Sequence, residues 1–190
     1  MNSLVGHGSM LVSLPFILVG IITLPWILRT QRSGLVSIIF GAAYANFLLV
    51  SIAAGTMVAA LVTHDFSVSY VAQVGSRSTP LLFTVISLWG ALEGSILFWA
   101  WVLSLYTVLV VTLHRHRPGT LVPYATMVLL LVSLFFAILL VGPADPFHAV
   151  FPVPLDGPGP NPLLQNHFLM AVHPPLLYLG YVGMSVPFAF

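Results

Sequence analysis

Residues 10–28 read MLVSLPFILVGIITLPWIL and contain no charged side chain. The hydrocarbon core of a bilayer is about 30 Å thick, and a helix needs about 20 consecutive apolar residues to cross it. This stretch therefore predicts a membrane-spanning helix. Pro15 is expected to kink it and Pro25 to mark its exit, because proline cannot donate a helical hydrogen bond.

Further stretches of the same kind follow along the chain. They are residues 35–62, 81–113, 121–141 and a last one that begins at Pro174. Residues 81–113 would form a helix about 50 Å long. That exceeds what a bilayer needs, so their early part, LLFTVISLW, is expected to lie in the interface or above it.

The composition of the whole chain agrees with a membrane protein. Only 5% of the residues are charged and 59% are hydrophobic, whereas soluble domains are about 25% charged. The predicted fold class is an all-α polytopic membrane protein with about five transmembrane helices in this fragment, its N-terminus outside and its last helix truncated. We expect the chain to be part of a longer protein.

The spans divide the chain into five parts. They are transmembrane helices 1 and 2 (1–62), a periplasmic loop (63–80), transmembrane helices 3 and 4 (81–141), a proline-rich periplasmic loop (142–172) and the start of transmembrane helix 5 (173–190). This division is an expectation from hydropathy and the placement of turn residues.

The arginines predict which side each loop occupies. Four of them share the turns after the first and third spans: Arg29, Arg32, Arg115 and Arg117. Cytoplasmic loops carry an excess of arginine and lysine, so these turns are expected inside. The N-terminus, both long loops and His173 would then face the periplasm. Arg77 is the one arginine on that side, and we expect it to meet a lipid phosphate.

Several classes of function are disfavoured by what the chain contains. A formal net charge of +1 offers no basic surface for nucleic acid. The chain has no cysteine, so it forms no disulfide, no thiolate metal site and no C-x-x-C-H haem attachment of its own.

The stretch WGALEGSILFWAW (89–101) holds the only charge within a predicted span, Glu93. An ionisable group in a membrane helix is costly and marks a function by default. Gly90 and Gly94 form a small-xxx-small pair that would let another helix approach closely. Trp89 belongs to the same motif. Two interpretations of Glu93 stay open, a structural anchor near the outer interface and a direct functional role.

The stretch MAVHPPLLYLGYVG (170–183) places His173 before two prolines. The residue before a proline is disfavoured in the α region, so His173 is expected to be the last extended residue before a helix. A neutral imidazole fixed there could serve as an axial ligand of haem iron. The alternative is an ordinary polar group at the membrane surface. The other histidines of the outer side show no ligand spacing: His7, His64, His148 and His167.

Four motifs occur in an order that resembles the CcmF family of cytochrome c-type biogenesis proteins, also called CycK. They are HDFSVSYVA (64–72), WGALEGS (89–95), NPLLQN (161–166) and HPPLLYLGYVG (173–183). The resemblance covers nearly the whole chain and corresponds to the N-terminal part of a longer protein. Leu92 and Asn166 depart from the residues usual in the family at these positions.

The resemblance implies a haem lyase subunit in the bacterial inner membrane. Such a protein receives haem b from the membrane-bound chaperone holo-CcmE and, with CcmH, helps to join it to apocytochrome c. His173 matches the first of two periplasmic histidines that hold this haem. The second ligand and most of the haem platform lie outside this fragment, so the fragment alone is expected to be inactive as an enzyme.

Two other functions are compatible with the residues alone. One is a proton- or solute-conducting membrane subunit in which Glu93 is a buried relay carboxylate. The other is a scaffold that docks partner helices through Gly90 and Gly94.

Overall fold

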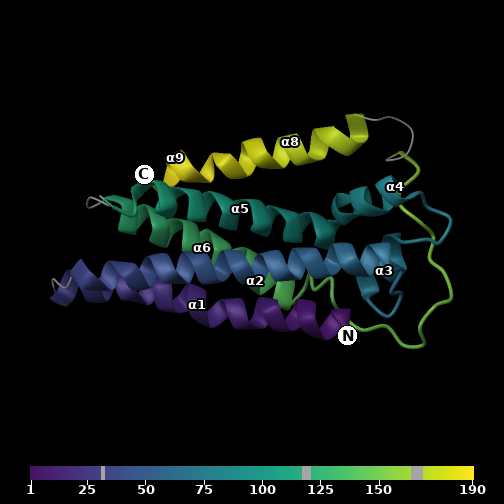
Figure 1. Cartoon of the computed structure of the whole chain (residues 1–190), viewed down its shortest axis with the longest axis horizontal. Coiled ribbons are helices and arrows are strands. Elements are labelled where there is room, and N and C mark those ends of the chain that lie inside the picture. The colour runs from purple at the N-terminus through teal and green to yellow at the C-terminus, as the bar shows by residue number, and fades with distance from the viewer. Residues whose placement is uncertain (31–32, 117–120, 164–168) are drawn as a thin grey trace.

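The protein is a bundle of long helices in the computed structural model, which describes residues 1–30, 33–116, 121–163 and 169–190. The four long helices are α1 (Asn2–Thr30), α2 (Val36–Val62), α5 (Leu92–His114) and α6 (Leu121–Val141). They lie side by side along the long axis (Figure 1), and α1 packs on α2 and α6 while α5 packs on α2 and α6. Each is long and apolar enough to cross a membrane.

Six shorter elements complete the described chain. They are η1 (Ser33–Leu35), α3 (Ser69–Val74), α4 (Leu81–Ile86), η2 (Ser87–Trp89), α8 (Leu169–Gly183) and α9 (Ser185–Ala189). The N-terminus, α3, α4 and the loop of residues 142–163 gather at one end of the bundle, which we call the loop end (Figure 1). The α1–α2 and α5–α6 connections lie at the opposite end, the turn end.

The first helix is longer than its hydropathy predicted. It begins at Asn2 rather than Met10 and contains both Pro15 and Pro25. Each proline leaves one backbone carbonyl of the preceding turn without its usual donor, and membrane helices tolerate this because neighbouring helices and local adjustments compensate. Hydropathy missed the first turns because their glycines, serines and His7 lower it there.

The stretch FSVSYVA (66–72) is mostly helical. Residues from Ser69 onward form α3, and only Val68 pairs as an isolated antiparallel bridge with Ala149. Backbone hydrogen bonds on either side of the bridge join Ser69 N to His148 O at 2.8 Å and Val150 N to Ser67 O at 2.9 Å. The two long loops are therefore tied to each other at the loop end.

Residues 81–113 do not form one continuous helix. The chain runs through α4 and η2, breaks at Gly90 and Ala91, and restarts as α5 at Leu92, with Ala91 in an extended conformation (φ −138°, ψ 175°). The Tyr70 hydroxyl stabilises the break, because it accepts a hydrogen bond from Ala91 N and donates to the carbonyl of Ser87 or Leu88. The segment LLFTVISLW is thus separate from the spanning helix α5.

The last expected span consists of two short helices. The prediction that His173 is extended is wrong, because α8 starts at Leu169 and contains His173, Pro174 and Pro175. The bias of a pre-proline residue against the helix is a preference, and the surrounding helix outweighs it here. The chain turns at Met184 before α9, where Pro187 has no N–H to offer the carbonyl of Gly183.

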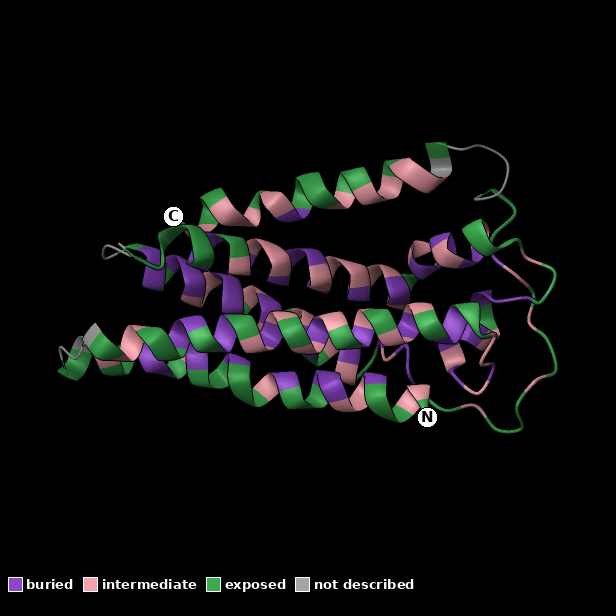
Figure 2. Ribbon diagram, in the orientation of Figure 1, coloured by how far each residue is buried: buried purple, intermediate pink, exposed green. Residues whose placement is uncertain are grey.

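Burial follows the bundle interior. Buried residues face the centre of the four long helices, while exposed residues lie on the outside and along much of α8 (Figure 2). Buried hydroxyls in the long helices bond to carbonyls of their own helix, as Thr107 Oγ1 does to Leu103 O at 2.8 Å and Thr126 Oγ1 to Val122 O at 2.8 Å. This satisfies them without a partner helix.

Candidate functional site

His173 lies in the second turn of α8, near the loop end of the bundle. Its side chain is exposed. Within the part of the chain that the structure describes, its ring makes no hydrogen bond and no ion pair. An imidazole of this kind has a ring nitrogen available for a ligand.

A stripe of α8 continues from His173 toward the turn end. Its members follow His173 by three, four, seven, eight and eleven residues, which places them within one half of the circumference of a helix with 3.6 residues per turn. They are Leu176, Leu177, Gly180, Tyr181 and Met184, and they line a shallow open groove of about 440 Å³. We call this set the α8 stripe. The sequence interpretation missed it, although the two leucines after HPP carried the signal.

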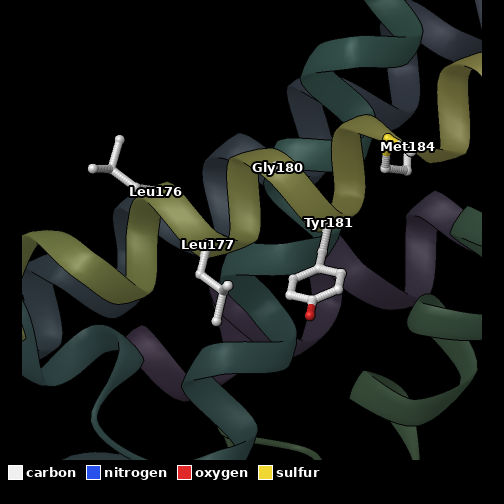
Figure 3. Close-up of a pocket in the computed structure, with 5 residues that line it drawn as sticks. All are labelled: Leu176, Leu177, Gly180, Tyr181 and Met184. Atoms are coloured by element: carbon white, nitrogen blue, oxygen red, sulfur yellow. The ribbon is translucent and has the colours of Figure 1, made fainter.

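Figure 3 shows how the α8 stripe is arranged. Leu177 and Tyr181 project from the same side of the ribbon, Leu176 projects from another, and Gly180 leaves the backbone bare between them. Leu176 and Tyr181 are 61% and 67% exposed, so no other described part of the chain covers them.

The donor set on α8 fits a haem in two respects. Haem iron takes an imidazole as an axial ligand, and His173 offers an exposed one. The porphyrin is large and apolar, and Leu176 and Leu177 stand about 5–6 Å further along the helix axis, within the radius of such a ring. Among the described residues no three His, Asp or Glu side chains come together as a metal site. His173 and the two leucines thus suit a haem, whose porphyrin holds the iron.

Glu93 lies at the start of α5, as the second residue of the helix, and not in the middle of a span. A carboxylate is favoured at this position because the helix N-terminus carries partial positive charge. Its Oε2 atom is buried and has no hydrogen-bond partner among the described residues, and the same holds for Trp89 Nε1. Glu93 thus lies at the loop-end terminus of α5, and its role as an anchor or as a relay stays a prediction.

Gly90 and Gly94 do not form a helix-docking pair. Gly90 lies in the break before α5, and only Gly94 belongs to that helix. A Cβ at Gly94 would lie 2.3 Å from Tyr70 Oη and 2.1 Å from Leu88 O. The absence of a side chain at Gly94 therefore leaves room for the Tyr70 ring of α3. Burial raises the pKa of the Tyr70 hydroxyl above its ordinary value. The importance of Tyr70 was not visible in the sequence.

Polar side chains fasten the loops at the loop end. Asn2 Nδ2 donates to Asp65 Oδ2 at 2.9 Å, and His7 Nδ1 lies 2.9 Å from Asp145 Oδ2. Hydrogen bonds, chiefly from the Ser67 hydroxyl, lower the pKa of Asp65. These contacts tie the first helix to both loops. His167 lies outside the described residues.

Arg77 also fastens a loop. Its backbone N–H donates to Asp156 Oδ1 at 2.9 Å and its Nε to Leu155 O at 3.1 Å. The N–H of Arg77 is the main reason that the pKa of Asp156 is lowered. The guanidinium lies over the ring of Phe66, 5.7 Å from its centroid. Arg77 thus has protein partners, and its contact with a lipid phosphate stays a prediction.

Comparison with known proteins identifies the relatives of this chain. The family model for the cytochrome C assembly protein matches residues 89–190. The cytochrome c-type biogenesis protein CcmF of Pseudomonas fluorescens is 39% identical over 150 residues, which is 78% of this chain and 23% of the relative. CycK of Rhizobium meliloti is 35% identical over 186 residues, 97% of this chain and 27% of the relative.

A solved structure agrees with these relatives. The cytochrome c haem lyase CcmF superimposes with a TM-score of 0.81 at 33% identity, covering 100% of this chain and 29% of that one. The chain spans about a quarter of the length of the curated relatives it matches. Both the sequence motifs and the helical bundle are therefore shared, and the chain belongs to the CcmF/CycK family of cytochrome c assembly proteins.

Proposed function

We propose that this chain is a haem-handling component of cytochrome c maturation in the bacterial inner membrane, and that His173 is an axial ligand of the haem iron. The loop end faces the periplasm. There the protein receives haem b from the membrane-bound chaperone CcmE and, together with CcmH, presents it to apocytochrome c.

The observation that carries this proposal is the open imidazole of His173 at the head of the exposed α8 stripe. A structural histidine at a helix surface is expected to bond to a neighbouring carboxylate or carbonyl, as His7 does with Asp145 and His114 Nδ1 with Val110 O. Among the described residues His173 has neither kind of partner. Membership in a family whose solved member is a haem lyase supplies the identity of the metal group.

The chemistry of attachment suits a chain without cysteine. Adding a thiol across a vinyl C=C bond forms a C–S and a C–H bond and consumes only the S–H and the double bond. No oxidant is needed, and both thiols come from the apocytochrome. What this chain contributes is position, because its helix holds the imidazole and the apolar stripe in one rigid arrangement.

The test compares His173→Gly with His148→Ala in cells that depend on this protein. His173→Gly is expected to abolish detectable holocytochrome c, measured by haem staining, and to shift or bleach the haem absorption of the purified protein. Added imidazole should restore part of the absorption, since a free ligand can occupy the space of the missing ring. His148→Ala, on the same outer side, should mature cytochrome c normally. Normal maturation in the His173→Gly strain would refute the assignment.

A further inference from the structure

The charged residues are divided between the two ends of the bundle. The four carboxylates of the chain all lie at the loop end: Asp65, Glu93, Asp145 and Asp156. Four of the five arginines lie, by their place in the sequence, in or next to the connections at the turn end: Arg29, Arg32, Arg115 and Arg117. The turn end therefore carries positive charge that no carboxylate of this chain can neutralise.

Arg29 lies at one end of an open groove on α1. The groove has a volume of about 410 Å³ and is lined by Ile22, Pro25, Trp26, Arg29 and Thr30, which we call the α1 groove. Its members follow Ile22 by three, four, seven and eight residues, so they share one side of the helix. Ile22 is 61% exposed and Trp26 is 59% exposed, so no other described part of the chain covers them.

Two donors of the α1 groove are available to a ligand. Within residues 1–30, 33–116, 121–163 and 169–190, neither the Arg29 guanidinium nor the Trp26 indole N–H has an acceptor. The Thr30 hydroxyl is already used, because its Oγ1 donates to Trp26 O at 2.9 Å. Since the chain has no carboxylate at this end, any anion that Arg29 binds comes from outside the chain.

The depth of the α1 groove favours an amphiphilic anion. Arg29 lies two residues beyond the apolar span Asn2–Ile27. Trp26 and Ile22 lie about 5 and 10 Å from Arg29 along the axis, toward the centre of the span. The polar layer on each side of a bilayer is about 5–8 Å thick. A phospholipid can therefore place its phosphate at Arg29, an ester carbonyl at the Trp26 N–H and an acyl chain along Ile22.

Other anions match only part of the α1 groove. A free phosphate ion or a soluble acidic peptide would pair with Arg29 but leave Ile22 and Trp26 uncovered. The charge at the turn end also selects among lipids, because Arg115 is exposed there as well. A headgroup that carries an ammonium group is repelled by this charge, whereas a headgroup with a net negative charge is attracted.

We propose that the α1 groove binds one anionic phospholipid of the phosphatidylglycerol type, with its phosphate on Arg29 and an acyl chain along Trp26 and Ile22. Arginine suits this role because its planar guanidinium donates two parallel hydrogen bonds to a phosphate. The inference is independent of haem binding at His173, and it assigns a ligand to the opposite end of the molecule.

The test uses two phospholipid probes with a photoreactive diazirine on the acyl chain, one with a phosphatidylglycerol and one with a phosphatidylcholine headgroup. Each is present at the same fraction in nanodiscs that hold the protein, and labelled residues are identified by mass spectrometry after illumination. The phosphatidylglycerol probe is expected to label residues 22–26 about fivefold more than the other probe, the ratio that one arginine near an anionic headgroup supplies. Arg29→Gln should reduce this ratio to unity, and Arg29→Lys should retain most of it.

Arg115→Gln is the matched control, because it removes one positive charge from the same end without touching the α1 groove. Arg115 follows α5, where its Nε donates to His116 Nε2 at 3.0 Å. The ratio at residues 22–26 should stay as in the parent protein. An equal fall in both glutamine variants would show only general attraction to the turn end and would overturn the site.

Two further outcomes would also overturn the proposal. Equal labelling of residues 22–26 by both probes in the parent protein would show that the headgroup is not recognised. Labelling of Leu18, which is 42% exposed on the same helix, without any labelling of residues 22–26 would show that protein, not lipid, covers the α1 groove.

Discussion

At the scale of the residue, Gly94 of α5 packs directly against Tyr70 of α3. The phenol reaches over the glycine and bonds to both sides of the break before α5. A buried hydroxyl with these partners fixes the local backbone, since losing it would leave carbonyl and N–H groups unsatisfied. The packing of α3 on α5 thus requires a glycine at position 94. The same contact fixes the start of α5, where Glu93 lies.

We predict that Gly94→Ala destabilises the protein by about 1–3 kcal/mol, the usual cost of overpacking a filled site. The new methyl group would meet Tyr70 and the backbone oxygen of Leu88, which cannot both move away. The midpoint of SDS- or urea-induced unfolding in micelles measures the change. Gly55→Ala is the matched control, because a Cβ there has no neighbour within 4 Å and α2 should gain slightly from it. Equal midpoints for the two variants would contradict the contact.

At the scale of the element, hydropathy alone predicts the bounds of some of the helices that are long enough to cross a membrane. The bounds of α6 and nearly those of α2 follow from where the uncharged stretch ends. The break before α5 could not be predicted from the sequence, because it depends on Tyr70 from a distant loop. The start of α8 differs because a local preference at His173 was given more weight than the continuing helix. Sequence-local rules fail where tertiary contacts decide.

The loop of residues 142–163, which contains Asp156, should respond to acid. Hydrogen bonds from backbone N–H groups lower the pKa of Asp156 below its ordinary 3.8, so its charged form stabilises the fold. This contribution is complete above pH 3.8 and is lost as the pH falls through the lower folded-state value. Hydrogen exchange of the Arg77 and Gly157 amides, corrected for intrinsic rates, should remain slow at pH 5 and accelerate below the folded pKa.

Asp156→Ala provides the control for this acid response. It should expose both amides already at pH 7 and remove the acid-induced change, because no carboxylate remains to be protonated. Amides of Ser67 and Phe147, which are bonded to other aspartates, should stay protected in this variant at pH 7. Protection at the Arg77 amide that is equal in the variant and the parent protein would contradict the anchoring role of Asp156.

At the scale of the whole molecule, the sequence indicates His173 as the candidate ligand, which stays a prediction, and the structure shows what surrounds it. His173 stood out because of the prolines that follow it, whereas the α8 stripe became evident only once the helix was seen to contain the histidine. The exposure of Phe151 and Leu155 had no signal in the sequence, because it results from how Arg77 and Ser67 hold the loop. The residue types indicate a candidate iron ligand. The contacts of the loops determine which side chains remain exposed.

The arrangement of the two ends makes the proposed orientation testable. Thr30 closes α1 at the turn end and Gln73 lies exposed in α3 at the loop end, and the chain has no cysteine of its own. In cells with a permeabilised outer membrane, a membrane-impermeant maleimide should label Gln73→Cys and reach Thr30→Cys only after lysis. The physical reason is the positive-inside rule, which predicts that loops with an excess of arginine stay on the cytoplasmic side. The reverse pattern would place His173 in the cytoplasm, where apocytochrome c thiols are not joined to haem, and would exclude the proposed function while leaving the fold unchanged.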